Sequence, residues 1–418
     1  MPAMANLLYL VHRMPYPPDK GDKVRSYHLL KHLAARHRVF LGTFMDDPDD
    51  ARHIDTLRSI CAGLHVAPLN PRNARLASLA GLWRGQALTL RYYHNAALQR
   101  WVADTLARER IDAAVVFSSS MAQYAERRPA LPMLVDLVDV DSAKWSDYAG
   151  AHRWPLSWLY RRESQHLLAY ERAIVAQAAG AFLVTAKEVD LFTRLAPETA
   201  GQVTALSNGV DADFFAPDPA RLSPFAADEI ALVFTGAMDY WPNVDAVCWF
   251  AREALPRLRQ QWPTLRLHVV GRSPAPAVRA LASDAVAVSG TVPDVRPYLQ
   301  HAAVVVAPLR LARGLQNKVL EAMAMARPTV VAATCAHALD VQAGRDVLPA
   351  HGIDDYVRLV DGLLREPRRA ADLGRAGRQR VLAVYSWAAR LAALDGPLAE
   401  VCSRVRPRSA PVLAGAMP

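Results

Sequence analysis

Residues 307–328 read APLRLARGLQNKVLEAMAMARP and set out one repeating unit of the fold. An apolar run ends at Pro308, basic residues and Gly314 follow, and a helical pattern begins at about Leu315. Pro328 stands just beyond that pattern, where a proline commonly ends a helix. A buried strand, a glycine-containing loop and a helix in this order form a βα unit of a parallel sheet. The segment therefore predicts an α/β fold.

The same alternation of short apolar strands and longer helical patterns extends along the rest of the chain. Nearly continuous apolar runs are typical of parallel strands that are covered on both faces. A first series of such runs occupies residues 6–11, 38–44, 113–118, 132–140 and 179–185, and a second series occupies residues 230–235, 265–270, 286–288, 302–307 and 329–332. Helical patterns such as residues 24–36, 244–261 and 315–326 lie between them. We therefore predict two Rossmann-like, doubly wound parallel sheets.

A stretch rich in proline and aspartate near residues 207–224 separates the two series. The chain has 418 residues, which is more than one hydrophobic core usually serves. We predict an N-terminal domain over residues 1–206, a C-terminal domain over 207–385, a helix over 386–403 and a flexible tail over 404–418. Open α/β sheets bind ligands beyond the carboxyl ends of their strands. Function is therefore expected in a cleft between the domains, in the loops that follow the strands.

Composition narrows the choice of partners and of compartment. The formal charge is +9 and the pI is near 9.5, which favours anionic partners such as nucleotides or phospholipids. The arginines are spread along the chain without a dense basic block, which argues against nucleic acid. The four cysteines form no CxxC pair, and no apolar run is long enough to span a bilayer. We expect a cytoplasmic protein without a membrane span, which can still lie on the inner face of the cytoplasmic membrane.

The start of the helix near Leu315 suits a diphosphate. A helix N-terminus offers unpaired backbone N–H groups and a partial positive charge. Gly314 lets the backbone approach a ligand closely, and Arg313 and Lys318 can add charge-assisted hydrogen bonds. Glu321 lies within the apolar stretch VLEAMAMA, where a carboxylate needs a partner. That partner is either two ribose hydroxyls or, as the alternative, Lys318 on an exposed helix edge.

The stretch GLQNKVLEAMAMARPTVV at residues 314–331 resembles the donor-site signature of family-4-like retaining glycosyltransferases of GT-B fold. SNGVD at 207–211 resembles the start of their C-terminal domain, and YSW at 385–387 the point where their chain crosses back to the N-terminal domain. PYPPDKGDKVRSYHLLKHLA at 15–34 and VDLVDVDSAKW at 135–145 are similar to the sugar transferases associated with exosortase/PEP-CTERM exopolysaccharide systems.

The resemblance implies two Rossmann-like domains that face a cleft, with the C-terminal helix packed back on the N-terminal domain. It also implies transfer of a sugar, with retention, from a nucleotide-diphosphate-sugar donor to a glycan or lipid-linked acceptor in exopolysaccharide synthesis. Neither a metal ion nor a further cofactor is expected. Two rivals remain open: a nucleotide-sugar 2-epimerase of the same fold and a catalytically inactive binding or scaffold protein. A dehydrogenase is disfavoured because the first strand is not followed by GxGxxG.

The resemblance also implies roles for individual residues on the donor side. It places Glu321 on the donor ribose, and it has Arg313 and Lys318 neutralise the departing diphosphate. The other predicted donor contacts are Gly236, Gly271, Arg272, Gly314, Leu315, Gln316 and Asn317. The chain departs from the Glu-x7-Glu signature at Arg313, where relatives hold a carboxylate, so the sugar is not implied.

On the acceptor side, the loop after the first strand contains Gly21 and opens a helix that carries Asp22, Lys23 and Arg25. These residues are predicted to face the cleft, or else to form a solvated charged loop. Asp139 and Asp141 follow another strand and are predicted either to orient an acceptor hydroxyl or to cap the next helix.

Many relatives carry a histidine after an N-terminal-domain strand, whereas here the strand ends in serines from Ser118. His28 and His94 are possible substitutes, although an ordinary helix or loop role suits each of them better. Residues 75–93 and 154–170 are amphipathic and contain arginine and tryptophan. They predict either a peripheral membrane contact or helices that line the acceptor site.

Overall fold

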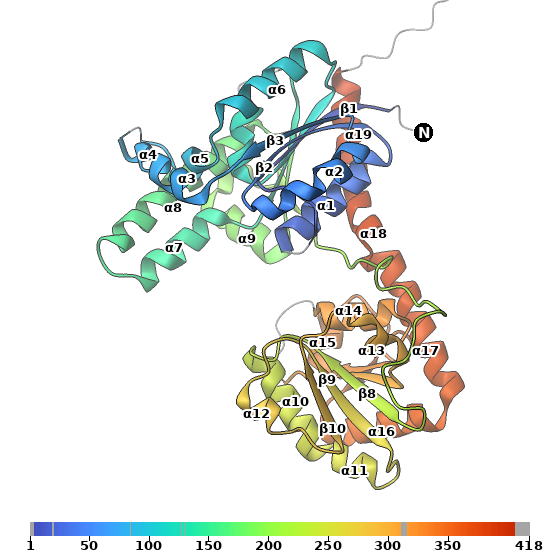
Figure 1. Ribbon diagram of the computed structural model, residues 1–418. Helices are drawn as coiled ribbons and strands as arrows, with labels where there is room; N and C mark the ends of the chain where they lie inside the picture. Colours follow the sequence, from blue (N-terminus) through green and yellow to red (C-terminus); the bar gives the residue numbers. More distant parts are fainter. Residues whose placement is uncertain are drawn as a thin grey trace, which may run out of the picture. The chain divides into compact units, whose positions relative to one another are not determined.

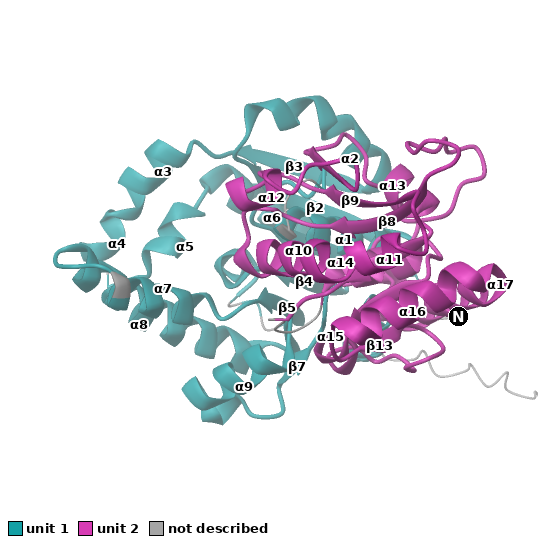
Figure 2. Ribbon diagram, turned by 90° about the horizontal axis from the view of Figure 1, so that it is seen from below, with its two compact units in different colours: residues 1–208, 391–418 teal, residues 209–390 magenta. Residues whose placement is uncertain are grey.

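The computed structural model describes residues 4–18, 21–83, 85–126, 128, 130–310 and 316–405. The chain divides into two compact units (Figure 2). Unit 1 consists of residues 1–208 and 391–418, and unit 2 consists of residues 209–390. Each unit has its own hydrophobic core around a parallel sheet.

Unit 1 is built on a seven-stranded parallel sheet with the order β3-β2-β1-β4-β5-β6-β7. The order runs outward in both directions from the β1–β4 pair, as in a doubly wound fold. Its strands are β1 (Asn6–Val11), β2 (Arg38–Met45), β3 (Gly63–Pro68), β4 (Ala113–Phe117), β5 (Met133–Val138), β6 (Gly180–Leu183) and β7 (Val203–Ala205).

Helices lie on both faces of this sheet and extend beyond one end of it (Figure 1). They are α1 (Gly21–Ala34), α2 (Ile54–Ile60), α3 (Pro71–Ser78), α4 (Ala80–Trp83), α5 (Leu88–Tyr92), α6 (Ala96–Arg108), α7 (Asp141–Ala151), α8 (Leu156–Gln177), α9 (Ala186–Leu195) and α19 (Asp395–Val405). The last of these, α19, contacts β4, and its Asp395 lies 2.7 Å from His32 Nε2. The prediction that a C-terminal helix returns to the N-terminal sheet is therefore confirmed.

Unit 2 contains a six-stranded parallel sheet with the order β10-β9-β8-β11-β12-β13. Its strands are β8 (Ile230–Thr235), β9 (Leu265–Val270), β10 (Val286–Gly290), β11 (Val304–Ala307), β12 (Thr329–Ala332) and β13 (Leu348–Ala350). Its helices are α10 (Trp241–Glu253), α11 (Leu255–Arg259), α12 (Pro276–Arg279), α13 (Arg296–His301), α14 (Asn317–Ala324), α15 (Ala333–His337), α16 (Ile353–Arg365), α17 (Pro367–Arg380) and α18 (Trp387–Leu391).

All ten strands predicted from the sequence are present, and four of them have the predicted bounds. The sequence missed β3, β7 and β13, which are three of the four edge strands of the two sheets. Edge strands are covered on fewer sides, so their apolar pattern is weaker; β3 is mostly half-buried. The helix predicted over residues 244–261 is two helices, α10 and α11, because Pro256 cannot continue the helical hydrogen bonding.

Candidate functional site

A pocket of about 490 Å³ opens in unit 2 where β8, β9 and β10 end and α14 begins. It adjoins the β8–β11 pair, from which the strand order runs outward in both directions, the usual position for a ligand in this sheet type. Its lining residues are Thr235, Gly236, Ala237, Tyr240, Asn243, Val270, Gly271, Arg272, Thr291, Val292, Val295, Gln316, Asn317, Lys318 and Glu321.

Two glycines let the ends of β8 and β9 approach each other at this pocket. Gly271 has φ +156°, and a Cβ atom there would lie 1.7 Å from the carbonyl oxygen of Gly236. Gly236 has φ +152°, and a Cβ atom there would lie 2.9 Å from Lys318 Nζ. No larger residue fits either position without moving backbone or the lysine. Both glycines therefore shape the pocket, so their role goes beyond that of a glycine in an ordinary tight turn.

Lys318 is held near the start of α14 with its ammonium group inside the pocket. Its Nζ donates a hydrogen bond to Asn243 Oδ1 and lies 4.6 Å from the centre of the Phe234 ring. Asn243 is fixed in turn by donating to the carbonyl of Ala237 at 2.8 Å. Burial lowers the pKa of Lys318 to about 8, although the Glu321 carboxylate acts in the opposite direction. A bound anion would therefore meet an oriented cation that is already partly desolvated.

Glu321 lies one turn further along α14 and also lines the pocket. Burial raises the pKa of Glu321, and the charge of Lys318 opposes that rise. Within the described residues its carboxylate has neither a hydrogen bond nor an ion pair, so the close Lys318–Glu321 pair that was the alternative to a ribose contact is not formed. A half-buried carboxylate in this state is poorly satisfied and can accept hydrogen bonds from ligand hydroxyls.

Seven of the predicted donor-side residues thus come together in one pocket: Gly236, Gly271, Arg272, Gln316, Asn317, Lys318 and Glu321. Arg272 is exposed, and within the described residues its guanidinium has no hydrogen-bond or ion-pair partner. The predictions for Arg313, Gly314 and Leu315 lie outside the described residues. The sequence missed Thr235, whose buried Oγ1 has no hydrogen-bond partner in the described structure. Its position at the end of an apolar strand was the signal that could have revealed it.

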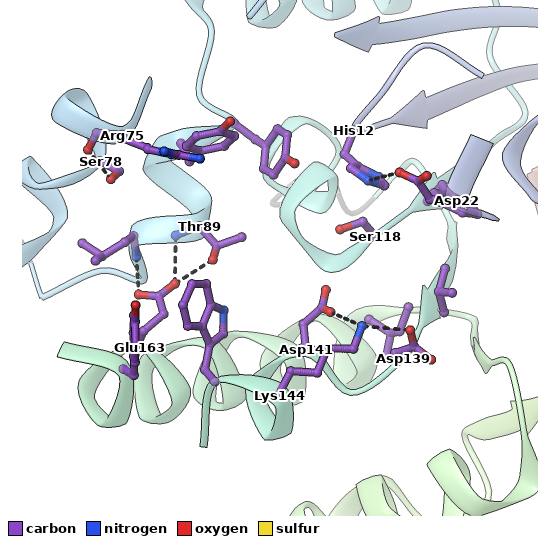
Figure 3. Close-up of a pocket in the computed structure, with 18 of the residues that line it drawn as sticks. His12, Asp22, Arg75, Ser78, Thr89, Ser118, Asp139, Asp141, Lys144 and Glu163 are labelled. Carbon is purple, nitrogen blue, oxygen red and sulfur yellow. Dashed lines mark hydrogen bonds and ion pairs between the residues drawn. The ribbon is translucent and has the colours of Figure 1, made fainter. Parts of the chain in front are cut away.

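A second pocket of about 490 Å³ lies in unit 1, beyond the carboxyl ends of β1, β4 and β5 (Figure 3). Aromatic rings form much of its wall, and charged groups surround them. Its lining residues are His12, Asp22, Arg75, Ser78, Leu88, Thr89, Tyr92, Tyr93, Phe117, Ser118, Leu137, Val138, Asp139, Asp141, Lys144, Trp145, Leu159, Tyr160 and Glu163. Three predicted acceptor-side residues, Asp22, Asp139 and Asp141, are among them.

His12 is a pocket residue that the sequence reasoning missed, although it directly follows β1. Its ring stacks on Phe117 with centroids 5.8 Å apart, and its Nε2 lies 3.4 Å from Asp22 Oδ2 (Figure 3). Asp22 also accepts a hydrogen bond from Arg13 at 2.6 Å. Burial raises the pKa of Asp22, but the contacts with His12 and Arg13 outweigh it and hold the pKa below its ordinary value. The loop thus places a histidine beside an ionised carboxylate.

Asp139 and Asp141 lie on the opposite side of this pocket from His12 (Figure 3). Both accept hydrogen bonds from Lys144 Nζ, at 2.8 and 3.0 Å. Burial acts to lower the pKa of Lys144, but the two carboxylates raise it above its ordinary value. The alternative in which Asp141 caps the following helix is wrong, because the cap position is Val140 and no side chain caps it.

Lys23 and Arg25 do not line the pocket, in contrast to the predicted orientation. Each is 1% exposed. Lys23 Nζ lies 2.7 Å from Asp50 Oδ2, and Arg25 donates to both carboxylate oxygens of Asp136 at 2.8 and 3.0 Å. Gly21 is the first residue of α1. The two ion pairs stabilise the start of α1, which carries Asp22, because a buried charge needs a partner.

The two histidines considered as substitutes lie elsewhere. His28 is buried beside Tyr27, and His94 is exposed and lies 3.4 Å from Gln123 Oε1. Neither lines a pocket described above. In the described part of the chain, no three His, Cys, Asp or Glu side chains are grouped so that they could hold a metal ion.

Residues 229–374, all within unit 2, match the family described as Glycosyl transferases group 1. Solved structures align with nearly the whole chain. Sucrose-phosphate synthase from Thermosynechococcus elongatus has 18% identity and a TM-score of 0.57, with 96% of this chain and all of that chain covered. The chain has the GT-B fold.

Two further GT-B structures show the same similarity. A glycosyltransferase from Rickettsia africae has 12% identity and a TM-score of 0.59, with 97% of this chain and all of that chain covered. HepE from Anabaena, solved in complex with UDP, has 13% identity and a TM-score of 0.55, with 95% of this chain and all of that chain covered. At these identities the likeness shows the fold alone. A search of curated proteins finds no match. The family match and the GT-B fold support a glycosyltransferase.

Proposed function

We propose that the protein transfers a sugar from a nucleotide-diphosphate-sugar donor, which binds in the pocket of unit 2. The observation that carries the proposal is that an oriented Lys318 and Glu321, whose carboxylate has no hydrogen bond or ion pair among the described residues, line the same pocket on α14. A diphosphate fits the cation and the helix N-terminus, and ribose hydroxyls fit the carboxylate. The structures of HepE with UDP and with UDP-glucose support this choice of ligand class.

We also propose the stereochemistry of the transfer and the class of acceptor. The anomeric configuration is retained, and the acceptor is a glycan or lipid-linked saccharide of exopolysaccharide synthesis that binds in the pocket of unit 1. The resemblance to exosortase-associated sugar transferases supports this part, as do the aromatic walls of that pocket, since flat rings pack against sugar faces. Leaving-group charge is stabilised by Lys318 and the α14 N-terminus, without a metal ion or a further cofactor.

A nucleotide sugar that is a true donor is expected to raise the melting temperature of the protein. Binding to the folded state alone stabilises it by mass action, by about 5 °C at a concentration about 100 times Kd. The measurement is a thermal-shift screen against UDP-, GDP-, ADP- and dTDP-sugars, with the free sugars as controls. Glu321→Ala should remove most of the shift. A screen without any shift in the wild-type protein would contradict the donor pocket.

Donor affinity is expected to fall as the pH rises above 8. The diphosphate needs the protonated form of Lys318, whose pKa in the unliganded pocket is about 8. Between pH 7 and pH 9 the apparent Kd should therefore rise by about tenfold. Calorimetric titration at several pH values measures this. Lys318→Met is the control, because its weaker binding should follow only the titration of the nucleotide base. Parallel pH profiles for the two proteins would contradict the assigned role.

Transfer itself is measured as nucleotide release that depends on an added acceptor. Isomerisation of the donor in the absence of an acceptor would instead indicate the 2-epimerase, and donor binding without turnover would indicate a binding protein. The configuration of the new glycosidic bond tests retention, and unchanged activity in EDTA tests independence from a metal ion.

A further inference from the structure

Seven large apolar or aromatic side chains are exposed at the end of unit 1 formed by α3, α4, α7 and α8. They are Leu76, Leu79, Trp83, Tyr148, Trp154, Leu156 and Trp158, together called the apolar tip surface below. Trp83 is 93% exposed and Trp154 is 80% exposed. Single exposed apolar side chains are common on protein surfaces, but several of them at one end of a domain indicate an interaction surface.

The two parts of this surface are tied together by polar contacts. Arg162 of α8 donates hydrogen bonds to the carbonyl of Gly81 in α4 at 3.0 Å and to that of Gln86 at 3.1 Å. Trp158 precedes Arg162 by one helical turn, and Trp83 follows Gly81 by two residues. Both views of the chain show α3, α4, α7 and α8 at the same end of unit 1 (Figures 1 and 2). The helices that carry the apolar tip surface therefore lie together at one end of unit 1, and hydrogen bonds join α8 to α4 there.

Positive charge surrounds the apolar tip surface. Residues 71–92 contain four arginines and no acidic residue, and residues 146–162 contain three arginines and one aspartate. Arg72, Arg153 and Arg161 are exposed. Tryptophan and leucine among arginines are the composition of an interfacial membrane contact, in which the apolar groups enter the headgroup region and the cations meet anionic lipid. Within the described residues, none of the helices is long and apolar enough to cross a bilayer.

The apolar tip surface is continuous with the pocket of unit 1. Arg75 and Ser78 of α3 line the pocket, whereas Leu76 and Leu79 beside them are exposed. On the other side, Trp145 and Tyr160 line the pocket with their ring centroids 5.4 Å apart, and the Tyr160 ring lies 6.2 Å from that of the exposed Tyr148. A molecule with its polar end in the pocket would thus have its remainder next to exposed apolar side chains.

We propose that the apolar tip surface docks on an anionic lipid bilayer and presents the pocket of unit 1 to an acceptor whose lipid part stays in that bilayer. The proposal rests on the proposed transfer function for the identity of the acceptor, but the docking itself does not depend on catalysis. Docking is peripheral: the tryptophans enter the interface, and the arginines bind lipid phosphate.

The test is sedimentation of the full-length protein with vesicles. Wild-type protein should bind vesicles of phosphatidylcholine mixed with phosphatidylglycerol, more weakly at high salt, and should bind pure phosphatidylcholine poorly. The triple variant Trp83→Ser/Trp154→Ser/Trp158→Ser should lose about tenfold or more of its partition coefficient. Arg72→Gln/Arg153→Gln/Arg161→Gln should lose its preference for the anionic lipid. The matched control is Leu222→Ser, which removes an equally exposed apolar side chain from unit 2 and should bind like wild type.

Two outcomes would overturn the proposal: no binding of wild-type protein to anionic vesicles, or equal binding by wild type and the tryptophan variant. Self-association of the wild-type protein that the tryptophan variant loses, without vesicle binding, would assign the surface to a protein contact instead. The thermal shift with nucleotide sugars is measured on the same variants. A variant that keeps the thermal shift but no longer binds vesicles has lost docking alone. Loss of the thermal shift would instead indicate damage to the donor pocket.

Discussion

Lys318→Ala is expected to lower kcat/KM for sugar transfer by about 10²- to 10³-fold. This is the usual effect of removing one preorganised group that stabilises charge in a transition state. The Lys318 ammonium is fixed between Asn243 and the Phe234 ring, at the start of α14. Negative charge grows on the diphosphate as the bond to the sugar breaks. Most of the loss should therefore appear in kcat, with a smaller rise in KM. The measurement is steady-state release of nucleoside diphosphate, with the donor that gives the largest thermal shift.

Glu321→Ala should instead raise KM for the donor more than it lowers kcat. Its carboxylate is proposed to hold the ribose, which does not change charge during the reaction. Arg310→Ala is the matched control for Lys318→Ala. Arg310 is a nearby basic residue in the sequence, but its exposed side chain pairs with Asp245 and does not line the pocket. Arg310→Ala should keep nearly all activity. Wild-type rates in both Lys318→Ala and Glu321→Ala would disprove the donor site.

The pocket of unit 2 could be predicted because its signals are local in the sequence. Gly236 and Gly271 each directly follow an apolar strand, and Lys318 and Glu321 are three residues apart in one helix. The carboxyl ends of parallel strands meet at one edge of a sheet, so these short segments necessarily converge. What the sequence could not supply is the partner of each charge: Lys318 binds Asn243, which is 75 residues away, and leaves Glu321 without an ion pair among the described residues.

The pocket of unit 1 was harder to predict because contacts between residues distant in the sequence decide which of its neighbouring charges line it. Asp22, Lys23 and Arg25 stand together in one loop and helix start, yet only Asp22 lines the pocket. Lys23 is paired with Asp50 and Arg25 with Asp136, which is 111 residues away. Asp136 is 2% exposed within the sheet, whereas Asp139 and Asp141, which follow it closely in the sequence, line the pocket. The pattern of charges alone does not distinguish a ligand contact from a buried pair.

Arg25→Met is expected to destabilise unit 1 by about 3–5 kcal/mol, since it leaves the Asp136 carboxylate buried without its partner. The side chain of Arg25 makes two hydrogen bonds with Asp136 and a third, at 2.8 Å, with Asn208 Oδ1. A loss of this size is a large part of the stability of a typical domain. Urea unfolding followed by hydrogen exchange of the unit 1 strands measures it, because the two units need not unfold together.

The double variant Arg25→Met/Asp136→Leu should recover much of the lost stability, because removing both partners leaves no unpaired charge buried in unit 1. Arg58→Gln is the surface control: it breaks an exposed pair with Asp55 and should change the free energy of unfolding by less than about 1 kcal/mol. If Arg25→Met unfolded like wild type and lost only acceptor-dependent turnover, Arg25 would be an acceptor contact, as the sequence predicted. A stability loss that the double variant reverses would instead establish that the Arg25–Asp136 pair stabilises the start of α1, where Asp22 lies beside His12.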